Sequence, residues 1–262
     1  MTAFTLARRE VPSLIVQDEV RSTNSELVAL ASAAEVATFT TVVTMNQTAG
    51  RGRLDRVWVA PPRTSLAISV LVRPPVGGEL VVEAGGWLPL AAGVAMHDAI
   101  RSVAPGLPVG IKWPNDVQIE GRKVCGILCE VIEGGSGVVI GAGLNVSMSP
   151  AQLPAPTATS LVIAGAPSDD ELYDRVLAAY LAALRSTLSA FWADGGDAQR
   201  SGLRAAVMER CTTLGRSVRV ELPGGSELLG TAVSIDSIGR LEVEDGSGRV
   251  HAIAAGDIVH LR

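Results

Sequence analysis

The chain has 262 residues, of which 47% are hydrophobic and 19% are charged. This length allows one large domain with a smaller one, and the apolar share is enough for a substantial core. The formal net charge is −5, which argues against non-specific nucleic-acid binding as the main activity. Aromatic residues make up only 3%, so the composition does not indicate a base-stacking platform either.

The cysteines Cys125, Cys129 and Cys211 are an odd number and include no CxxC pair. The first two fall in one β-like stretch, where four residues span roughly 13 Å, too far for a disulfide. Reduced, buried thiols are therefore expected, as in a cytoplasmic protein. The three histidines are dispersed and predict no metal cluster. The N-terminus lacks the pattern of a signal peptide, and no uninterrupted run of about 18 apolar residues predicts a membrane span.

The first part of the chain predicts strands alternating with helices. The strands are expected over residues 14–16, 42–45 and 65–72, and the helices over residues 24–34 and 85–101. Thr23 and Glu26 have the spacing of a capping box at the first helix. The exposed N–H and hydroxyl groups at such a helix start can also bind a polar ligand, and the two interpretations are compatible.

A glycine- and arginine-rich stretch follows the second strand and reads Gly50-Arg51-Gly52-Arg53-Leu54-Asp55-Arg56. Its glycines expose backbone N–H groups, and its arginines offer planar donor forks suited to phosphate or carboxylate. The pattern therefore favours an anion-binding loop. Taken alone, it is also typical of a solvated surface loop.

The rest of the chain first predicts successive hairpins and then a second unit. Strands are expected over 109–119 with a kink at Pro114, over 123–133 and over 138–146, which indicates a mainly antiparallel sheet. Helices are expected from a second capping box at Ser168 and Glu171 through Leu188, and over 198–210. Short strands over 217–222, 229–235, 241–244 and 250–254 predict a small β-barrel, with a domain boundary near residue 214.

Three short motifs carry a family resemblance. They are Gly50-Arg51-Gly52-Arg53, Lys112-Trp113-Pro114-Asn115-Asp116 and Lys123-Val124-Cys125-Gly126-Ile127-Leu128. Together with Ser22-Thr23-Asn24 and Gly143-Leu144-Asn145, their order and spacing resemble the biotin protein ligases, also called biotin–[acetyl-CoA-carboxylase] ligases, from about residue 13 to residue 261. The resemblance implies an α+β fold. It places a class II synthetase-like catalytic domain with flanking helices at residues 1–214 and an SH3-like β-barrel at residues 215–262.

The resemblance also implies a two-step reaction. Biotin and ATP give biotinyl-5′-AMP and pyrophosphate, and a lysine of a biotin carboxyl carrier domain of an acyl-CoA carboxylase then attacks the acyl carbon. Fixed cations and backbone donors lower the repulsion between a carboxylate and a polyphosphate, which explains the residue types of the motifs. Mg²⁺ is expected to accompany ATP, without a direct metal-binding motif in the chain.

The family's functional residues can be carried over to the matching positions of this sequence. The expected catalytic residues are Lys123, Arg53 and Arg51. The expected biotin-binding residues are Ser22, Thr23, Asn24, Gln47, Gly50, Arg51, Gly52, Arg53, Lys123 and Gly126. The expected ATP- and adenylate-binding residues are Arg51, Arg53, Trp58, Lys112, Asn115, Asp116, Lys123 and Asn145, with Asp116 the candidate for contact near phosphate or Mg²⁺. Trp113 and Pro114 are expected to be structural, and the role of Arg56 is open.

Two other functions compete with this interpretation. A lipoate–protein ligase would share the fold and the acyl-adenylate chemistry. A non-catalytic biotin-responsive regulator would need a nucleic-acid or partner module, and the stretch before Ser22 is too short for a helix-turn-helix. We therefore expect a ligase without DNA binding or membrane association, located in the cytoplasm, as a monomer or weak homodimer.

Overall fold

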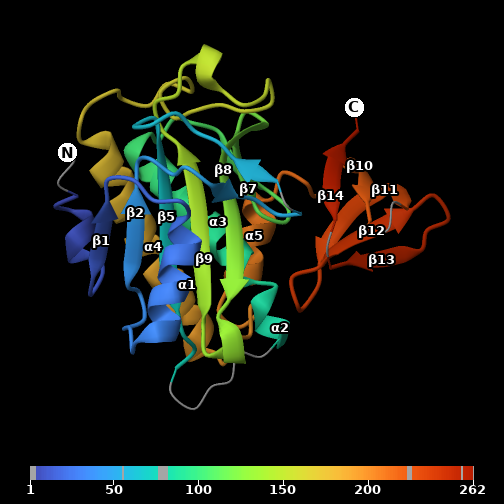
Figure 1. The fold of residues 1–262 in the computed structure, drawn as a ribbon. Helices are drawn as coiled ribbons and strands as arrows, with labels where there is room; N and C mark the ends of the chain where they lie inside the picture. Colours follow the sequence, from blue (N-terminus) through green and yellow to red (C-terminus); the bar gives the residue numbers. More distant parts are fainter. Residues whose placement is uncertain (1–3, 55, 76–81, 223–225, 255, 262) are drawn as a thin grey trace.

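A computed structural model describes residues 4–54, 56–75, 82–222, 226–254 and 256–261. Its larger unit is built on a seven-stranded sheet with the order β1-β2-β5-β9-β8-β7-β6 (Figure 1). The strands are β1 (Leu14–Gln17), β2 (Thr41–Thr44), β5 (Ser65–Val72), β6 (Val109–Lys112), β7 (Asp116–Ile119), β8 (Arg122–Val131) and β9 (Val138–Asn145). All neighbouring pairs are antiparallel except β1 and β2. The expected mixed, mainly antiparallel sheet is confirmed.

Helices cover both faces of this sheet. They are α1 (Thr23–Ala33), α2 (Val82–Gly85), α3 (Leu88–Val103), α4 (Leu172–Ala193) and α5 (Leu203–Arg210), with the short 3₁₀ helices η1 (Ala7–Arg9), η2 (Glu133–Gly135) and η3 (Pro150–Gln152). Figure 1 shows α1 on one face and α3, α4 and α5 on the other. The main core lies on the side of α3 and α4, and a smaller apolar cluster joins α1 to the sheet through Leu27, Val42 and Val139.

By length and composition, α4 could cross a membrane. Its apolar stripe, which includes Leu177, Leu181, Leu184 and Leu188, is instead buried in the core of this unit. The helix packs along α3, as the core helix of a globular protein does.

A second, five-stranded sheet forms the C-terminal unit. Its strands are β10 (Ser217–Glu221), β11 (Glu227–Ile235), β12 (Leu241–Asp245), β13 (Val250–Ile253) and β14 (Asp257–His260), in the order β13-β12-β11-β10-β14. Two buried indoles hold its β11–β12 turn against the larger unit. The Trp87 Nε1 donates to the carbonyl of Ser237 at 2.9 Å, and the Trp113 Nε1 donates to the carbonyl of Gly239 at 3.0 Å. These bonds fix the small unit to the start of α3 and to the turn after the edge strand β6, and Figure 1 shows it at one side of the larger unit.

The N-terminal segment is held by one buried carboxylate. Asp174 accepts hydrogen bonds from the backbone N–H groups of Leu6 at 2.8 Å and Ala7 at 2.9 Å. These bonds fix η1 to the first turn of α4.

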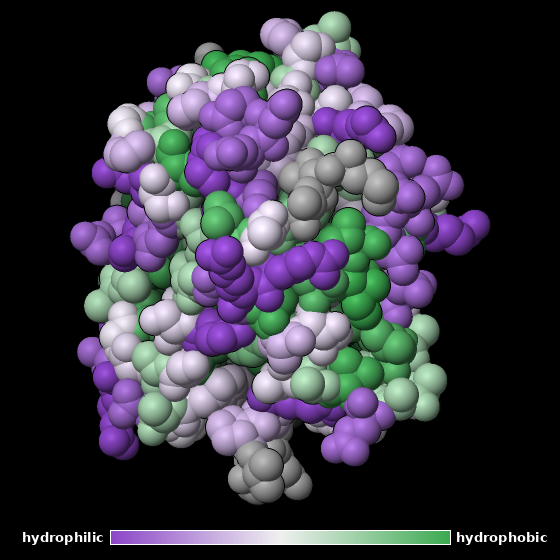
Figure 2. Space-filling view, turned by 90° about the vertical axis from the view of Figure 1, so that its left-hand side faces the viewer, coloured by the Kyte–Doolittle hydropathy of each residue, from purple (hydrophilic) through white to green (hydrophobic). Residues whose placement is uncertain are grey.

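Figure 2 views the molecule from the side of β1, where hydrophilic and hydrophobic residues are interspersed.

The helix boundaries correct several sequence-based expectations. The N-cap of α1 is Ser22, whose Oγ accepts a hydrogen bond from the N–H of Ser25. The prediction of a capping box at Thr23 and Glu26 was therefore wrong. The capping box at Ser168 was also wrong, because α4 begins at Leu172 without a side-chain cap. The helix expected over 85–101 begins at residue 88, where Pro89 occupies the first turn, and the helix expected from 198 begins only at residue 203.

Candidate active site

The glycine- and arginine-rich stretch forms a small hairpin over the sheet. Gly50 pairs with Trp58 and Arg51 pairs with Val57, which gives the two-residue strands β3 (Gly50–Arg51) and β4 (Val57–Trp58). The sequence predicted a loop here, so these strands are a correction. We call residues 50–58 the lid; within it, Asp55 lies outside the described residues. Beneath the lid is a cavity of about 360 Å³.

One end of the cavity is polar and lies at the start of α1. The N–H of Thr23 donates to Gln47 Oε1 at 2.9 Å, and the Ser69 Oγ lies 2.6 Å from Asn24 Oδ1. The backbone of Gly141 passes so close to the Asn24 amide that a Cβ there would collide with it. Side chains at the N-terminus of a helix thus present hydroxyl, amide and backbone groups to the cavity.

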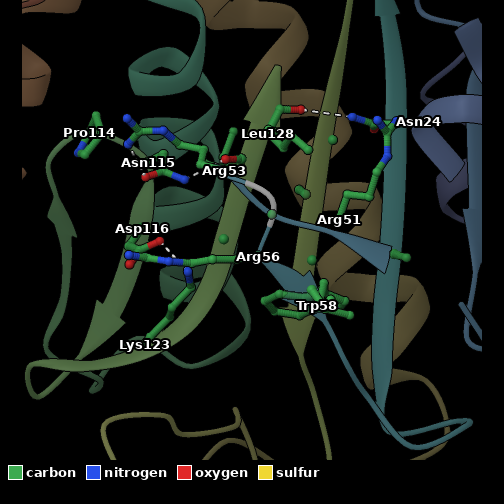
Figure 3. Close-up of a pocket in the computed structure, with 18 of the residues that line it drawn as sticks. Asn24, Arg51, Arg53, Arg56, Trp58, Pro114, Asn115, Asp116, Lys123 and Leu128 are labelled. Atoms are coloured by element: carbon green, nitrogen blue, oxygen red, sulfur yellow. Dashed lines mark hydrogen bonds and ion pairs between the residues drawn. The ribbon is translucent and has the colours of Figure 1, made fainter. Parts of the chain in front are cut away.

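The opposite end of the cavity is strongly charged. Lys123 Nζ lies 2.6 Å from Asp116 Oδ1, and Arg53 Nη1 donates to Asn115 Oδ1 at 3.1 Å. Figure 3 shows these residues at one side, with Asn24 and Arg51 at the other side and Trp58 between the two groups. The tight turn between β6 and β7 places Asn115, whose Nδ2 donates to the carbonyl of Ile127 at 2.7 Å.

Burial perturbs two cations at this end. It lowers the pKa of Lys112 from its ordinary value of 10.5, and the nearby positive charge of Lys123 lowers it further. Burial also lowers the pKa of Arg53. Lys112 and Lys123 are the two lysines of the whole chain, and both line the cavity. Concentrated positive charge that is partly removed from water is suited to a polyanionic ligand.

Trp58 crosses the middle of the cavity, above two glycines. A Cβ at Gly143 would lie 2.6 Å from the Trp58 Cε2, so only glycine allows the indole this position. At Gly126 a Cβ would lie 3.0 Å from the Lys123 Nζ. The Trp58 Nε1 is buried and has no hydrogen-bond partner among the described residues, so this donor is free for a ligand.

The C-terminal unit completes the cavity, which the sequence did not predict. Glu221, Asp257, Ile258 and Val259 line it, and Asp257 forms an ion pair with Arg56 of the lid. No motif marks these positions. In the sequence, Glu221 and Asp257 look like ordinary solvent-exposed acidic residues of short β-strands. Only the position of the C-terminal unit against the larger unit shows that they line the cavity.

Most of the predicted site residues come together around this one cavity. The predicted binding and catalytic residues that line it are Ser22, Thr23, Asn24, Gln47, Arg51, Gly52, Arg53, Trp58, Lys112, Asn115, Asp116, Lys123 and Gly126. Arg56, Trp113 and Pro114 also line it. Gly50 and Asn145 are not among the lining residues. Gly50 is buried in the hairpin, where a Cβ would lie 2.6 Å from the carbonyl of Trp58. Asn145 is 2% exposed, and its Nδ2 donates to the carbonyl of Thr159 at 2.9 Å.

The described residues offer neither a cysteine nucleophile nor a resident metal site. The three cysteines are free, and burial raises the pKa of Cys125 to about 12, so its thiol stays protonated. Among these residues no three His, Cys, Asp or Glu side chains are grouped so as to hold a metal ion. The arrangement can bind an anion beside a polar ligand and stabilise charge that develops between them.

The comparisons with known proteins agree on one family. Residues 16–146 match the model of the biotin/lipoate A/B protein ligase family, and residues 213–261 match that of the biotin protein ligase C-terminal domain. A biotin–[acetyl-CoA-carboxylase] ligase of Mycobacterium tuberculosis is 39% identical over 95% of this chain and 89% of its own length. That of Paracoccus denitrificans is 33% identical over 87% of this chain and 92% of its own length.

A solved structure shows the same fold. The biotin protein ligase from Aquifex aeolicus in complex with biotin and ATP superposes with a TM-score of 0.74 at 27% identity. The match covers 96% of this chain and 99% of that chain, so it includes both units.

Proposed function

This chain belongs to the biotin/lipoate A/B protein ligase family, and we infer that it is an ATP-dependent biotin protein ligase that modifies acetyl-CoA carboxylase. The observation that supports this function best is the division of one cavity into a polar end and a cationic end. A neutral, hydrogen-bonding ring system fits the first end and a polyphosphate fits the second. The carboxylate that joins the two substrates then lies between them.

The first step joins the biotin carboxylate to the α-phosphate of ATP and releases pyrophosphate. Two anions must approach each other, so fixed positive charge at the point of contact lowers the barrier. We assign this role to Lys123 and Arg53. Lys123 is held by Asp116 at 2.6 Å, and Arg53 is oriented by Asn115 at 3.1 Å, so both are positioned before the substrates arrive.

In the second step, the ε-amine of the carrier lysine attacks the acyl carbon of biotinyl-5′-AMP. The new C–N amide bond forms, the bond from carbon to the phosphate oxygen breaks, and AMP leaves with its electron pair. The amine loses a proton to solvent. The same two cations stabilise the departing AMP, and closure of the lid keeps water from the mixed anhydride until the lysine arrives.

We propose that ATP is used as its Mg²⁺ complex. Mg²⁺ prefers oxygen ligands and is held in such sites by one or two carboxylates together with substrate phosphates. The carboxylates of Asp116 and Asp257 line the cationic end and fit this requirement. With no larger group of metal-ligating side chains among the described residues, the phosphates would supply most of the ligands.

Further proposals concern the context of the enzyme. We propose a catalytic domain over residues 1–214 and a C-terminal domain over residues 215–262, supported by the two separate sheets. We propose that the enzyme acts in the cytoplasm, which the three free cysteines support, and that it does not bind DNA, which the net charge of −5 supports. A monomer or weak homodimer is proposed as the oligomeric state.

The function is tested with radiolabelled biotin and radiolabelled lipoate, offered separately with MgATP and a biotin carboxyl carrier domain. We expect pyrophosphate release and label on the carrier with biotin alone. Transfer of lipoate without transfer of biotin would overturn the assignment in favour of a lipoate ligase. Binding of biotin without any pyrophosphate release would instead favour a non-catalytic sensor.

A further inference from the structure

Glu130 on β8 lies behind the polar end of the cavity and joins two of its binding segments. It does not line the cavity, and it lies two residues beyond the motif Lys123–Leu128. Its carboxylate nevertheless contacts Asn24 at the start of α1 and Arg51 in the lid. We propose that Glu130 is a positioning residue for biotin, one that orients the Asn24 amide and holds the lid down at the polar end.

The first contact determines which face of the Asn24 amide is offered to a ligand. Asn24 Nδ2 donates to Glu130 Oε2 at 2.7 Å and to the carbonyl of Leu128 at 3.2 Å, so both of its hydrogens are used. On the other side, the Ser69 Oγ lies 2.6 Å from Asn24 Oδ1. An amide oxygen can accept two hydrogen bonds, so Asn24 keeps acceptor capacity on this oxygen and has no free donor.

This arrangement matches the chemistry of the substrate. The ureido ring of biotin carries N–H donors, and a site residue that offers only an acceptor recognises such a donor. Without the carboxylate at 130, one Asn24 N–H would lose its partner, and the amide could turn its NH₂ group toward the cavity. Glu130 therefore acts through Asn24 and does not itself touch the substrate.

The second contact ties the lid to the sheet. Arg51 Nη2 lies 2.8 Å from Glu130 Oε1 and 2.9 Å from the Oγ of Ser25. Figure 3 shows the Arg51 side chain reaching toward Asn24, away from Lys123. The ion pair closes the polar end of the lid over the cavity, while Arg53 and Arg56 hold the cationic end. Its loss would let the reactive adenylate escape more often.

Two substitutions separate the two contacts. Glu130→Gln keeps an amide oxygen that accepts from Asn24 and removes the charge that holds Arg51. Glu130→Met has a similar length and removes both. Glu133→Gln is the matched control, because Glu133 follows the same strand and is exposed. All variants are compared by thermal melting, by steady-state pyrophosphate release and by the rate at which a preformed enzyme–biotinyl-5′-AMP complex loses its ligand.

For Glu130→Met we expect the KM for biotin to rise by roughly tenfold or more, because the buried Asn24 amide would lose a hydrogen-bond partner. The KM for ATP should stay within about twofold of wild type. For Glu130→Gln we expect a nearly unchanged KM for biotin and a two- to fivefold faster loss of adenylate, the usual range for a partly exposed ion pair. Glu133→Gln is expected to match the wild type in all three measurements.

The orienting role is overturned if the KM for biotin in Glu130→Met stays within twofold of wild type. It is also overturned if the KM for biotin and the KM for ATP rise equally. Unchanged adenylate retention in Glu130→Gln overturns the lid role, and this nearly isosteric variant remains informative if Glu130→Met does not fold. The inference rests on the proposed ligase function. Absence of biotin-dependent pyrophosphate release from the wild-type enzyme would count against that function, whereas normal wild-type activity with unaffected variants counts against Glu130 alone.

Discussion

Replacing Lys123 with alanine tests the assigned chemistry most directly. The Lys123 Nζ stands at the cationic end of the cavity, 2.6 Å from Asp116 Oδ1. Removing one preorganised group that stabilises transition-state charge costs roughly 10²–10³ in rate, or about 2.7–4 kcal/mol. Lys123→Ala also leaves Asp116 as an unpaired negative charge facing the phosphates. We therefore expect the rate of adenylate formation to fall by at least about a hundredfold.

The loss of activity should not arise from unfolding. The side chains of Lys123 and Asp116 are 36% and 21% exposed, and ion pairs with such access to solvent contribute about 0–1 kcal/mol to stability. For a chain of this size, 1 kcal/mol corresponds to about 2–4 °C in Tm. A change of Tm of up to about 4 °C, together with a hundredfold loss of rate, would identify a chemical role.

The assay is pyrophosphate release under single-turnover conditions with saturating biotin and MgATP. The double variant Lys123→Ala/Asp116→Asn removes the unpaired carboxylate as well, and we expect it to recover part of the lost rate. Lys123→Arg keeps the charge and should retain more activity than Lys123→Ala. Pyrophosphate release by Lys123→Ala within tenfold of the wild-type rate would refute the assignment of Lys123 to the first step.

Four further outcomes are expected. Arg53→Gly should release free biotinyl-5′-AMP faster than wild type, measured by rapid separation of ligand and protein, since one of the side chains that close the lid is lost. Burial lowers the pKa of Lys112, so part of this amine is neutral as the pH rises toward 10.5, and bound ATP favours its charged form. ATP binding at high pH should therefore be accompanied by proton uptake. Calorimetry in buffers of different ionisation enthalpy should show this uptake in wild type and not in Lys112→Gln. An amine-acylating reagent should modify at most Lys112, Lys123 and the N-terminus, with MgATP protecting both lysines in peptide mass spectrometry. Asp174→Ala should lower stability by about 1.5–3 kcal/mol in urea unfolding, because two backbone N–H groups lose a charged partner, without changing the KM for biotin.

The sequence predicted the central sheet from local patterns, and the family resemblance of its motifs predicted most of the residues that line the cavity. The strand over residues 65–72 was predicted with its observed bounds, since its residues alternate and turns flank it. The motifs around Arg53, Asn115 and Lys123 place side chains at strand ends and turns, and these ends meet at one cavity. The order and spacing of these motifs carried the family resemblance, and the resemblance named these residues together.

The missed features depend on contacts between distant segments. β3 and β4 have two residues each, too few for any periodicity, and their pairing depends on the close approach of Gly50 to Trp58. The sequence did not predict β14, because four residues between turns give a weak pattern. The contribution of Asp257 to the cavity was therefore not predicted either. Glu130 falls within the strand expected over residues 123–133, and nothing local in the sequence indicates that Asn24 and Arg51 lie beside it.

The charges of the cavity also explain why the lid alone does not make the site. At the cationic end, Arg53, Arg56, Lys112 and Lys123 lie near two carboxylates, those of Asp116 and Asp257. The ion pairs of Asp116 with Lys123 and of Asp257 with Arg56 partly neutralise these cations. For the proposed MgATP substrate, Asp116 and Asp257 would help to hold the divalent cation, whose charge would offset the repulsion between the phosphates and these carboxylates. Since Asp257 comes from the C-terminal sheet, that sheet contributes to the charge balance at the cationic end. We therefore expect loss of the Asp257 carboxylate to change the Kd for ATP more than the Kd for biotin.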